Sequence, residues 1–323
     1  MIEKKKDPKL PDLELPELAA TIDRLEQATL PAASTVPVPV KLKTAIEKLE
    51  TYLDVDPSQV PSELAAEVLS YYSRGKLIAL EAIGGDGYVI SYLDEIGRKL
   101  ILKIARPKKV GWEMPAKAGI IKSFSESGQK IKTISIARER FRDGCAIQLS
   151  LNKELVAAGI QEFVIPGVFF FSETPTLHLV MEYVPGIPFL RWIKESKNII
   201  ASLRLFCVLL RAVAFIHKFG IVHRDLKPEN LITTGKVVGV IDFNTARRQE
   251  RNLTISGTAV GSKTHAAPEQ MEDAKNATEV SDIFSLGMLF LEVVLAEAAP
   301  RPLNLNLLCE EDKAQYVADL ETK

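Results

Sequence analysis

The stretch that decides the fold reads His223-Arg224-Asp225-Leu226-Lys227-Pro228-Glu229-Asn230, and Asp242-Phe243-Asn244 follows it. It places a cation and an amide shortly after the carboxylate of Asp225, and the second carboxylate, Asp242, ends a short β-type run. Phosphoryl transfer from ATP needs a group that orients the nucleophile, a cation near the γ-phosphate and oxygen ligands for Mg²⁺. These residue types at this spacing therefore predict that chemistry.

The same stretch resembles the catalytic and metal-binding loops of protein kinases. The resemblance extends over residues 77–296, and the segments Ala267-Pro268-Glu269 and 281–287 are similar to those of bacterial-type serine/threonine kinases. It implies an α+β, two-lobed protein-kinase-like fold with a small β-rich N-lobe and a helical C-lobe. It also implies ATP and Mg²⁺ as cofactors and serine or threonine hydroxyls of an unknown protein substrate as acceptors.

The resemblance assigns a role to each polar residue of the stretch. Asp225 would orient the substrate hydroxyl and accept its proton, and Lys227 would stabilise the γ-phosphate. Asn230 and Asp242 would hold Mg²⁺, which prefers hard oxygen ligands. His223 is expected to pack against Phe243, and Asp282 to accept hydrogen bonds from backbone amides of the catalytic loop.

The nucleotide site is assigned by the same resemblance. It consists of Ile83, Gly84, Gly85, Gly87, Lys103, Gln148, Met181, Glu182, Val184 and Ile232. Lys103 would neutralise the α- and β-phosphates. Met181 would be the gatekeeper, and backbone groups of Glu182 and Val184 would hold the adenine edge.

Several positions depart from the family pattern. Counting back from Gly159 places Gln148 where a glutamate should pair with Lys103, and Ile101 stands where a small residue normally covers the adenine. Glu139 and Glu154 fall out of register for the same pairing.

The two loops that meet the phosphates also depart from the pattern. In the glycine-rich turn, Asp86 falls near the place of the second glycine and Val89 near that of the third. Asn244 replaces the usual glycine after Asp-Phe, and we expect it to adopt the left-handed geometry that asparagine tolerates.

Composition limits the classes of function. The chain of 323 residues is 46% hydrophobic and 26% charged, with a formal net charge of −1, which is ordinary for a soluble globular protein. Neither nucleic acid nor a membrane surface is expected as a partner. Three cysteines are too few for a disulfide framework, and no secretory signal is visible, so a cytoplasmic location is predicted. The apolar stretch at 284–299 is interpreted as a buried core helix because it is short for a membrane span and carries glutamates.

Changes in periodicity divide the chain. Residues 1–75 are predicted to be a helical extension, with helices near 16–28, 40–53 and 62–72. Residues 76–183 form the predicted N-lobe, and 184–323 a C-lobe shortened at its end. The basic insert at 106–133 is interpreted as a solvated loop, with an acidic-partner or nucleic-acid patch as the alternative. A helix is predicted over 134–158.

Two alternatives to an active serine/threonine kinase remain open. A pseudokinase, acting as a nucleotide-binding or scaffolding module, is favoured by Gln148, Ile101 and the irregular glycine turn. A small-molecule kinase of similar fold is disfavoured by Lys227 and the Ala-Pro-Glu segment. For an active kinase we expect control by phosphorylation within the activation segment. The sites are Thr254, Ser256 or Thr258, pairing with Arg224 and with Arg247 or Arg248.

Overall fold

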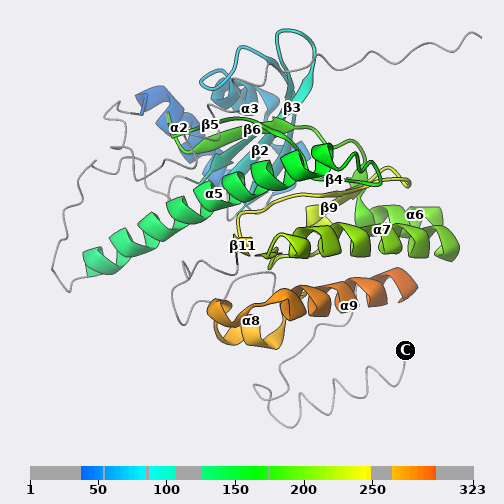
Figure 1. Ribbon diagram of the computed structural model, residues 1–323. Coiled ribbons are helices and arrows are strands. Elements are labelled where there is room, and N and C mark those ends of the chain that lie inside the picture. Colours follow the sequence, from blue (N-terminus) through cyan, green and yellow to red (C-terminus); the bar gives the residue numbers. More distant parts are fainter. Residues whose placement is uncertain are drawn as a thin grey trace, which may run out of the picture.

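The computed structural model describes residues 38–53, 55–84, 87–106, 126–173, 175–248 and 264–295, and only the backbone of residues 126–136. A sheet flanked by helices forms one part of the molecule, and a helical part lies beside it (Figure 1). The helix predicted near 16–28 lies outside the described residues.

The first part is built on a five-stranded antiparallel sheet in the order β1-β2-β3-β6-β5. Its strands are β1 (Lys76–Gly84), β2 (Gly87–Leu93), β3 (Lys99–Ala105), β5 (Val168–Ser172) and β6 (His178–Glu182). All five strands lie within residues 76–183, the predicted N-lobe.

The central strand β3 is buried on both faces, which explains why its sequence is almost continuously apolar. Successive side chains of a strand point to opposite faces. Leu100, Leu102 and Ile104 pack in one hydrophobic cluster, and Ile101 and Ala105 pack in another on the opposite face.

The helices of the N-terminal extension cover the first of these faces. They are α2 (Val40–Leu49), the 3₁₀ turns η1 (Glu50–Tyr52) and η2 (Pro57–Gln59), and α3 (Ser62–Leu69). The apolar stripes of α2 and α3 pack against Tyr88, Ile90 and Tyr92 of β2 as well as against β3. The extension is therefore part of the core of the first lobe.

Helix α5 (Glu126–Ala157) covers the opposite face and crosses in front of the sheet in Figure 1. Phe141 and Cys145 of this helix pack against Ile101 and Met181 of the sheet. The helix begins at Glu126, so the prediction that it starts near residue 134 was wrong. The basic residues there made this stretch resemble a loop.

The second part consists of helices and short strands. The helices are α6 (Phe189–Ser196), α7 (Ile199–Lys218), α8 (Pro268–Glu272) and α9 (Glu279–Leu295), with 3₁₀ turns η3 (Pro228–Asn230) and η4 (Ala274–Asn276). The strands are β4 (Phe163–Val164), β7 (Ile187–Pro188), β8 (Ile221–Val222), β9 (Leu231–Thr233), β10 (Val238–Val240) and β11 (Arg247–Arg248). They form the small sheets β4-β10-β9-β7 and β11-β8.

Helix α7 is, among the described helices, the one long and apolar enough to cross a membrane by length and composition. Its Leu209, Ala212 and Ile216 are completely buried in the core shared with α9 and the small strands. We therefore assign α7 to the core of this lobe. Helix α9 contains residues 284–295 of the stretch predicted to be a buried helix.

Candidate functional site

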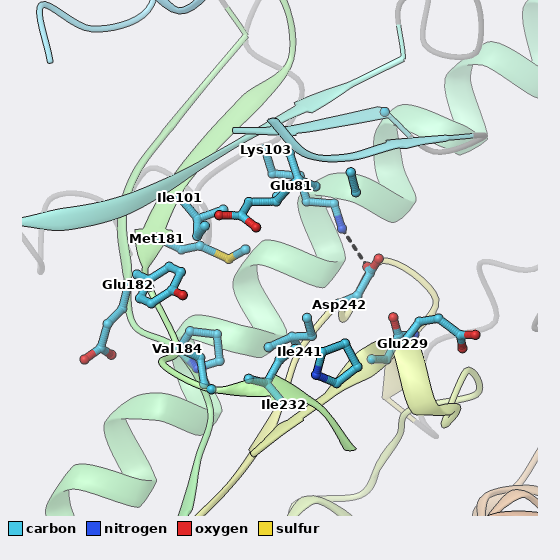
Figure 2. A pocket seen from close by; sticks show the side chains of 18 of the residues that line it. Glu81, Ile101, Lys103, Met181, Glu182, Val184, Glu229, Ile232, Ile241 and Asp242 are labelled. Atoms are coloured by element: carbon cyan, nitrogen blue, oxygen red, sulfur yellow. Dashed lines mark ion pairs between the residues drawn. The ribbon is translucent and has the colours of Figure 1, made fainter. Parts of the chain in front are cut away.

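A cavity of about 720 Å³ lies between the two parts. Figure 2 shows it from close by, with strand residues above and the two loops of the decisive stretch below. Its lining residues are Glu81, Ala82, Ile83, Gly87, Val89, Ile101, Lys103, Pro166, Met181, Glu182, Tyr183, Val184, Gly186, Pro188, Lys227, Glu229, Asn230, Ile232, Ile241 and Asp242. Most of the residues assigned to the nucleotide from the sequence therefore surround one space. Gln148 does not line it, Gly85 lies outside the described residues, and only the backbone of Gly84 is described.

The hairpin over the cavity corrects the predicted register of the glycine-rich turn. Strands β1 and β2 pair Gly84 with Gly87, and Val89 of β2 lies opposite Lys103 of β3. Laying the pattern G-x-G-x-x-G-x-V on this hairpin puts Val89 at its last position. Ala82 then takes the first glycine position, and Gly84 and Gly87 take the second and third. The earlier alignment was therefore wrong by two residues at Val89.

Lys103 projects from β3 into the cavity and binds the carboxylate of Asp242. The segment Asp242-Phe243-Asn244 is called the metal loop below. Its Nζ lies 2.7 Å from Oδ1 of Asp242, and its side chain is 7% exposed. Burial acts to raise the pKa of Asp242, but the charge and hydrogen bond of Lys103, together with the hydrogen bond from the Asn244 amide, outweigh it and lower that pKa. This ion pair joins the sheet to the loop directly (Figure 2).

Gln148, which the sequence placed at the position of a glutamate partner for Lys103, does not pair with Lys103. The Gln148 amide is buried, and its Nε2 donates to the carbonyl oxygen of Pro166 at 2.9 Å and lies 3.4 Å from Sδ of Met181. Among the α5 residues whose side chains the structure describes, Glu139 and Glu154 do not pair with Lys103 either. A one-residue error along a helix turns a side chain by about 100°, so counting from a loop could not fix this contact.

The catalytic loop brings a carboxylate, an ammonium group and an amide together. Lys227 Nζ lies 2.8 Å from Oδ2 of Asp225. The side-chain amide of Asn230 donates to the carbonyl oxygen of Asp225 at 2.8 Å and to its Oδ2 at 2.9 Å. Burial alone would lower the pKa of Lys227, but the charges of Asp225, Asp242 and Glu229 outweigh it and raise that pKa. Lys227 is therefore held as a cation at the edge of the cavity.

The metal loop has its strain at Asp242, where φ is 63°. Left-handed backbone at a residue other than glycine costs free energy and is common at functional sites. The expectation that Asn244 would take this geometry was wrong, because the described residues with positive φ include Asp242 but not Asn244. The Asn244 amide instead donates to Oδ1 of Asp242 at 3.2 Å.

His223 and Asp282 support these loops from below. The His223 ring packs on that of Phe243 at 4.9 Å between centroids, as predicted. Asp282, on α9, is completely buried. Its carboxylate accepts 2.8 Å hydrogen bonds from the backbone amides of His223 and Arg224 and contacts His217 Nε2 at 2.8 Å. The predicted bonds between Asp282 and the loop amides are thus present.

Three arginines gather behind the catalytic loop. Burial, together with the nearby cations of Arg247 and Arg140, lowers the pKa of Arg224 to about 10. Arg224 donates to the carbonyl oxygens of Thr245 and Ala274. Within the described part of the chain, Nε and Nη1 of Arg247 are buried without a hydrogen-bond partner. Buried donors of this kind favour an anion.

The hinge between the lobes, Met181 to Val184, lines the cavity. The Glu182 amide is not available to a base, because it donates to the carbonyl oxygen of Gly167 at 2.9 Å. The Glu182 carboxylate turns away from the cavity in Figure 2 and accepts from the Gly167 amide at 3.2 Å. Val184, Ile232 and Ile241 close the opposite wall.

Asn230 and Asp242 fit Mg²⁺ by the chemistry of their donor atoms. The amide nitrogen of Asn230 is engaged with Asp225, which leaves its carbonyl oxygen for another partner. Lys103 and Asn244 engage Oδ1 of Asp242, and Oδ2 is outside these contacts. Both side chains line the same cavity, and hard oxygen atoms are the ligands that Mg²⁺ prefers.

Several lining residues were missed from the sequence. They are Glu81, Ala82, Val89, Pro166, Tyr183, Gly186, Pro188, Glu229 and Ile241. The correct register of the glycine turn would have found Ala82 and Val89. Glu81 carries no comparable signal, since an acidic residue in a strand is usually at a solvated surface.

Comparisons with known proteins agree with this geometry. The family model described as the protein kinase domain matches residues 132–315. A probable serine/threonine-protein kinase PknB of Lactococcus lactis is 30% identical over 176 residues, covering 53% of this chain and 28% of that protein. The serine/threonine-protein kinase KIN28 of Saccharomyces cerevisiae is 30% identical over 206 residues, covering 61% of this chain and 65% of that protein.

A further relative comes from Mycobacterium tuberculosis. Its serine/threonine-protein kinase PknA is 31% identical over 230 residues, covering 68% of this chain and 46% of that protein. All three matches span less than two thirds of the relative's own length.

Proposed function

Because the chain belongs to the protein kinase family, we propose that it transfers the γ-phosphate of ATP to serine or threonine hydroxyls of protein substrates. The observation that carries the proposal is the cavity itself. Lys227 and Asn230, which both bind Asp225, line this cavity together with the ion pair of Lys103 and Asp242.

Each residue has a role that follows from its charge and its position in the cavity. Asp225 orients the acceptor hydroxyl and takes its proton, while Lys227 moves from Asp225 to the transferring phosphoryl group. Lys103 binds the α- and β-phosphates, which requires it to leave or share Asp242. Asn230 and Asp242 would hold Mg²⁺, which would supply positive charge to offset that of the phosphate oxygens. The remaining catalysis is positioning of the reacting groups within the cavity.

Support for the acceptor and the location is indirect. The ammonium group of Lys227 next to Asp225 favours a serine or threonine hydroxyl over a tyrosine. The near-neutral charge of the chain and the free thiol of Cys145 fit a cytoplasmic protein. No observation identifies nucleic acid or a membrane as a partner.

The test is transfer from isotopically labelled Mg-ATP to the protein itself and to a generic basic protein substrate, with phosphosites mapped by mass spectrometry. We expect phosphoserine or phosphothreonine in the parent and none in Asp225→Asn. Label on Asp225→Asn at the parent's rate would refute the assignment of the catalytic carboxylate.

One observation favours the alternative of a pseudokinase. Lys103 is tied to Asp242 without a glutamate from the described part of α5, and Ile101 narrows the adenine side of the cavity. Binding of Mg-ATP by calorimetry without any transfer would establish that alternative.

A further inference from the structure

Helix α5 touches the metal loop at a glycine. A Cβ added at Gly144 would lie 2.6 Å from the carbonyl oxygen of Phe243, 2.9 Å from its carbonyl carbon and 3.0 Å from Cα of Asn244. All three atoms belong to backbone, which cannot turn aside as a flexible side chain can. The helix backbone and the loop backbone are therefore in direct contact, and a single methyl group would force them apart.

The helix is held firmly on its own side of this contact. Phe141 and Cys145 are buried against the sheet, with exposures of 3% and 1%. The Gln148 amide, one turn further on, is bound to Pro166 and Met181. Burial raises the pKa of the Cys145 thiol, and the charges of Lys103 and Asp242 also act on it, which places this part of the helix beside the ion pair.

The loop is held equally firmly on the other side. The Phe243 ring is 1% exposed and packs on His223. The carbonyl oxygen of Phe243, which faces Gly144, accepts a 3.0 Å hydrogen bond from the amide of Ala246. The strained backbone of Asp242 directly precedes this peptide. Movement of the Phe243–Asn244 peptide would therefore change the direction of the Asp242 carboxylate.

We propose that Gly144 is a positioning residue for Asp242, and that close backbone contact replaces a helix carboxylate in fixing α5 against the site. In the described part of the chain Lys103 is bound to Asp242 and not to an acid of α5. The ion pair thus ties the loop to the sheet, while the bare backbone of Gly144 sets its distance from the helix. The inference rests on the proposed function only in treating Asp242 as the metal ligand.

The glycine at position 144 makes helix α5 less stable than an alanine there would. Glycine in a helix interior is less stable than alanine, because it loses more backbone freedom on folding. Replacing a helical glycine that has open space around it by alanine should therefore stabilise the protein. Gly287 of α9 is such a position, since an added Cβ there meets nothing within 4 Å. It provides a matched control for Gly144.

The experiment compares Gly144→Ala with Gly287→Ala by hydrogen exchange of the free protein. We expect the amides of 244–246 to exchange at least about tenfold faster in Gly144→Ala, because the methyl group pushes the loop from the helix. In Gly287→Ala we expect these amides to exchange at the same rate as in the parent protein. Equal exchange at these amides in the parent and in folded Gly144→Ala would overturn the proposal.

A second measurement connects the contact to the nucleotide. Titration calorimetry with Mg-ADP should give a Kd about tenfold weaker for Gly144→Ala, with catalytic turnover about 100-fold lower, since misplacement of about 1 Å has that effect. Binding of ADP without Mg²⁺ should change less than about twofold, because the defect lies at the metal ligand. Equal weakening with and without Mg²⁺ would point to general damage and would also overturn the proposal.

Two outcomes separate this inference from the proposed function. If the parent transfers no phosphate, the kinase activity fails, but the exchange comparison still decides the contact. If Gly144→Ala does not fold, hydrogen exchange of the parent protein provides the test. Amides 244–246 that exchange as slowly as the amides of α5 around residue 144 support the contact. Exchange there at the rate of an open loop overturns it.

Discussion

Helices α5 and α9 hold the catalytic cavity from two sides, and they do so by opposite means. Helix α9 contributes Asp282, a completely buried carboxylate that accepts bonds from the His223 and Arg224 amides. Helix α5 contributes Gly144, which has no side chain and meets the loop backbone directly. The support from α9 depends on the charge of the Asp282 carboxylate and on the direction of its hydrogen bonds, so replacing one carboxylate oxygen should break it. The support from α5 depends on volume alone.

The largest effect is expected at Asp242, the carboxylate beside the contact of α5 with the loop backbone. Asp242→Asn removes the charge that pairs with Lys103 and would hold Mg²⁺, with little change in volume. We expect phosphoryl transfer to fall about 1,000-fold, the scale of losing an electrostatic contact to the transition state. Turnover assays with Mg-ATP would measure it, with folding checked by circular dichroism.

The matched control for this change is Asp56→Asn in the exposed turn before η2. Asparagine caps a helix about as well as aspartate, so activity and fold should remain those of the parent. Unchanged turnover in folded Asp242→Asn would remove Asp242 from the metal site.

Asp282→Asn would test the support from α9. Asparagine offers one acceptor oxygen in place of two, so one buried loop amide of His223 or Arg224 loses its partner. We expect the free energy of unfolding to fall by about 2–4 kcal/mol, measured by urea denaturation, and Asp56→Asn to cost less than about 0.5 kcal/mol. A loss for Asp282→Asn as small as that of the control would show that α9 supports the loop by packing, as α5 does.

Gln148→Glu would test whether a carboxylate on α5 can support the site by pairing with Lys103. The structure predicts that it cannot, because the carboxylate would meet the carbonyl oxygen of Pro166 in place of a donated hydrogen bond. We expect the free energy of unfolding to fall by about 1–3 kcal/mol without a gain in affinity for Mg-ATP. The exposed Gln161→Glu should change it by less than about 0.5 kcal/mol. Tighter Mg-ATP binding would mean that residue 148 can reach Lys103.

The smallest effect is expected from the arginine cluster that joins the two supports. Arg140 comes from α5, and the backbone of Arg224 is bound to Asp282 of α9. A phosphate on Thr254, Ser256 or Thr258 would supply an anion to this cluster and steady both helices against the loop. We expect the triple alanine variant at these positions, which lie outside the described residues, to lose about tenfold in activity.

Thr44→Ala, on the exposed side of α2, is the control for this last change and should leave activity unaltered. Phosphosite mapping of the parent would identify the modified residue. Full activity in the triple variant, toward any substrate that the parent phosphorylates, would exclude this mode of control.

Local patterns predicted most of the fold and the centre of the site. Asp225, Lys227 and Asn230 lie within one short run, so their mutual placement depends on a single turn. The strands of the sheet were predictable because each is short, apolar and bounded by turn residues. Helix α6 gives a weaker signal, because eight residues are too few for a clear period.

Contacts across long separations could not be predicted in the same way. The partner of Lys103 depends on how α5 is rotated and how closely it packs, and both are set by Gly144 and Gln148 against groups from distant parts of the chain. The left-handed residue of the metal loop is Asp242, because tertiary contacts outweigh the preference of asparagine for that geometry. Propensity alone could not show this.

The burial of β3 on both faces has a consequence for making the protein in soluble form. The family match begins at residue 132, so a fragment trimmed to it would lack Lys103 and the whole glycine hairpin. A fragment beginning at β1 would keep them but would strip α2 and α3 from the apolar row of Leu100, Leu102 and Ile104. An exposed apolar face of that kind promotes aggregation. We therefore expect a soluble fragment of this protein to need the chain from the start of α2, well before the family match begins.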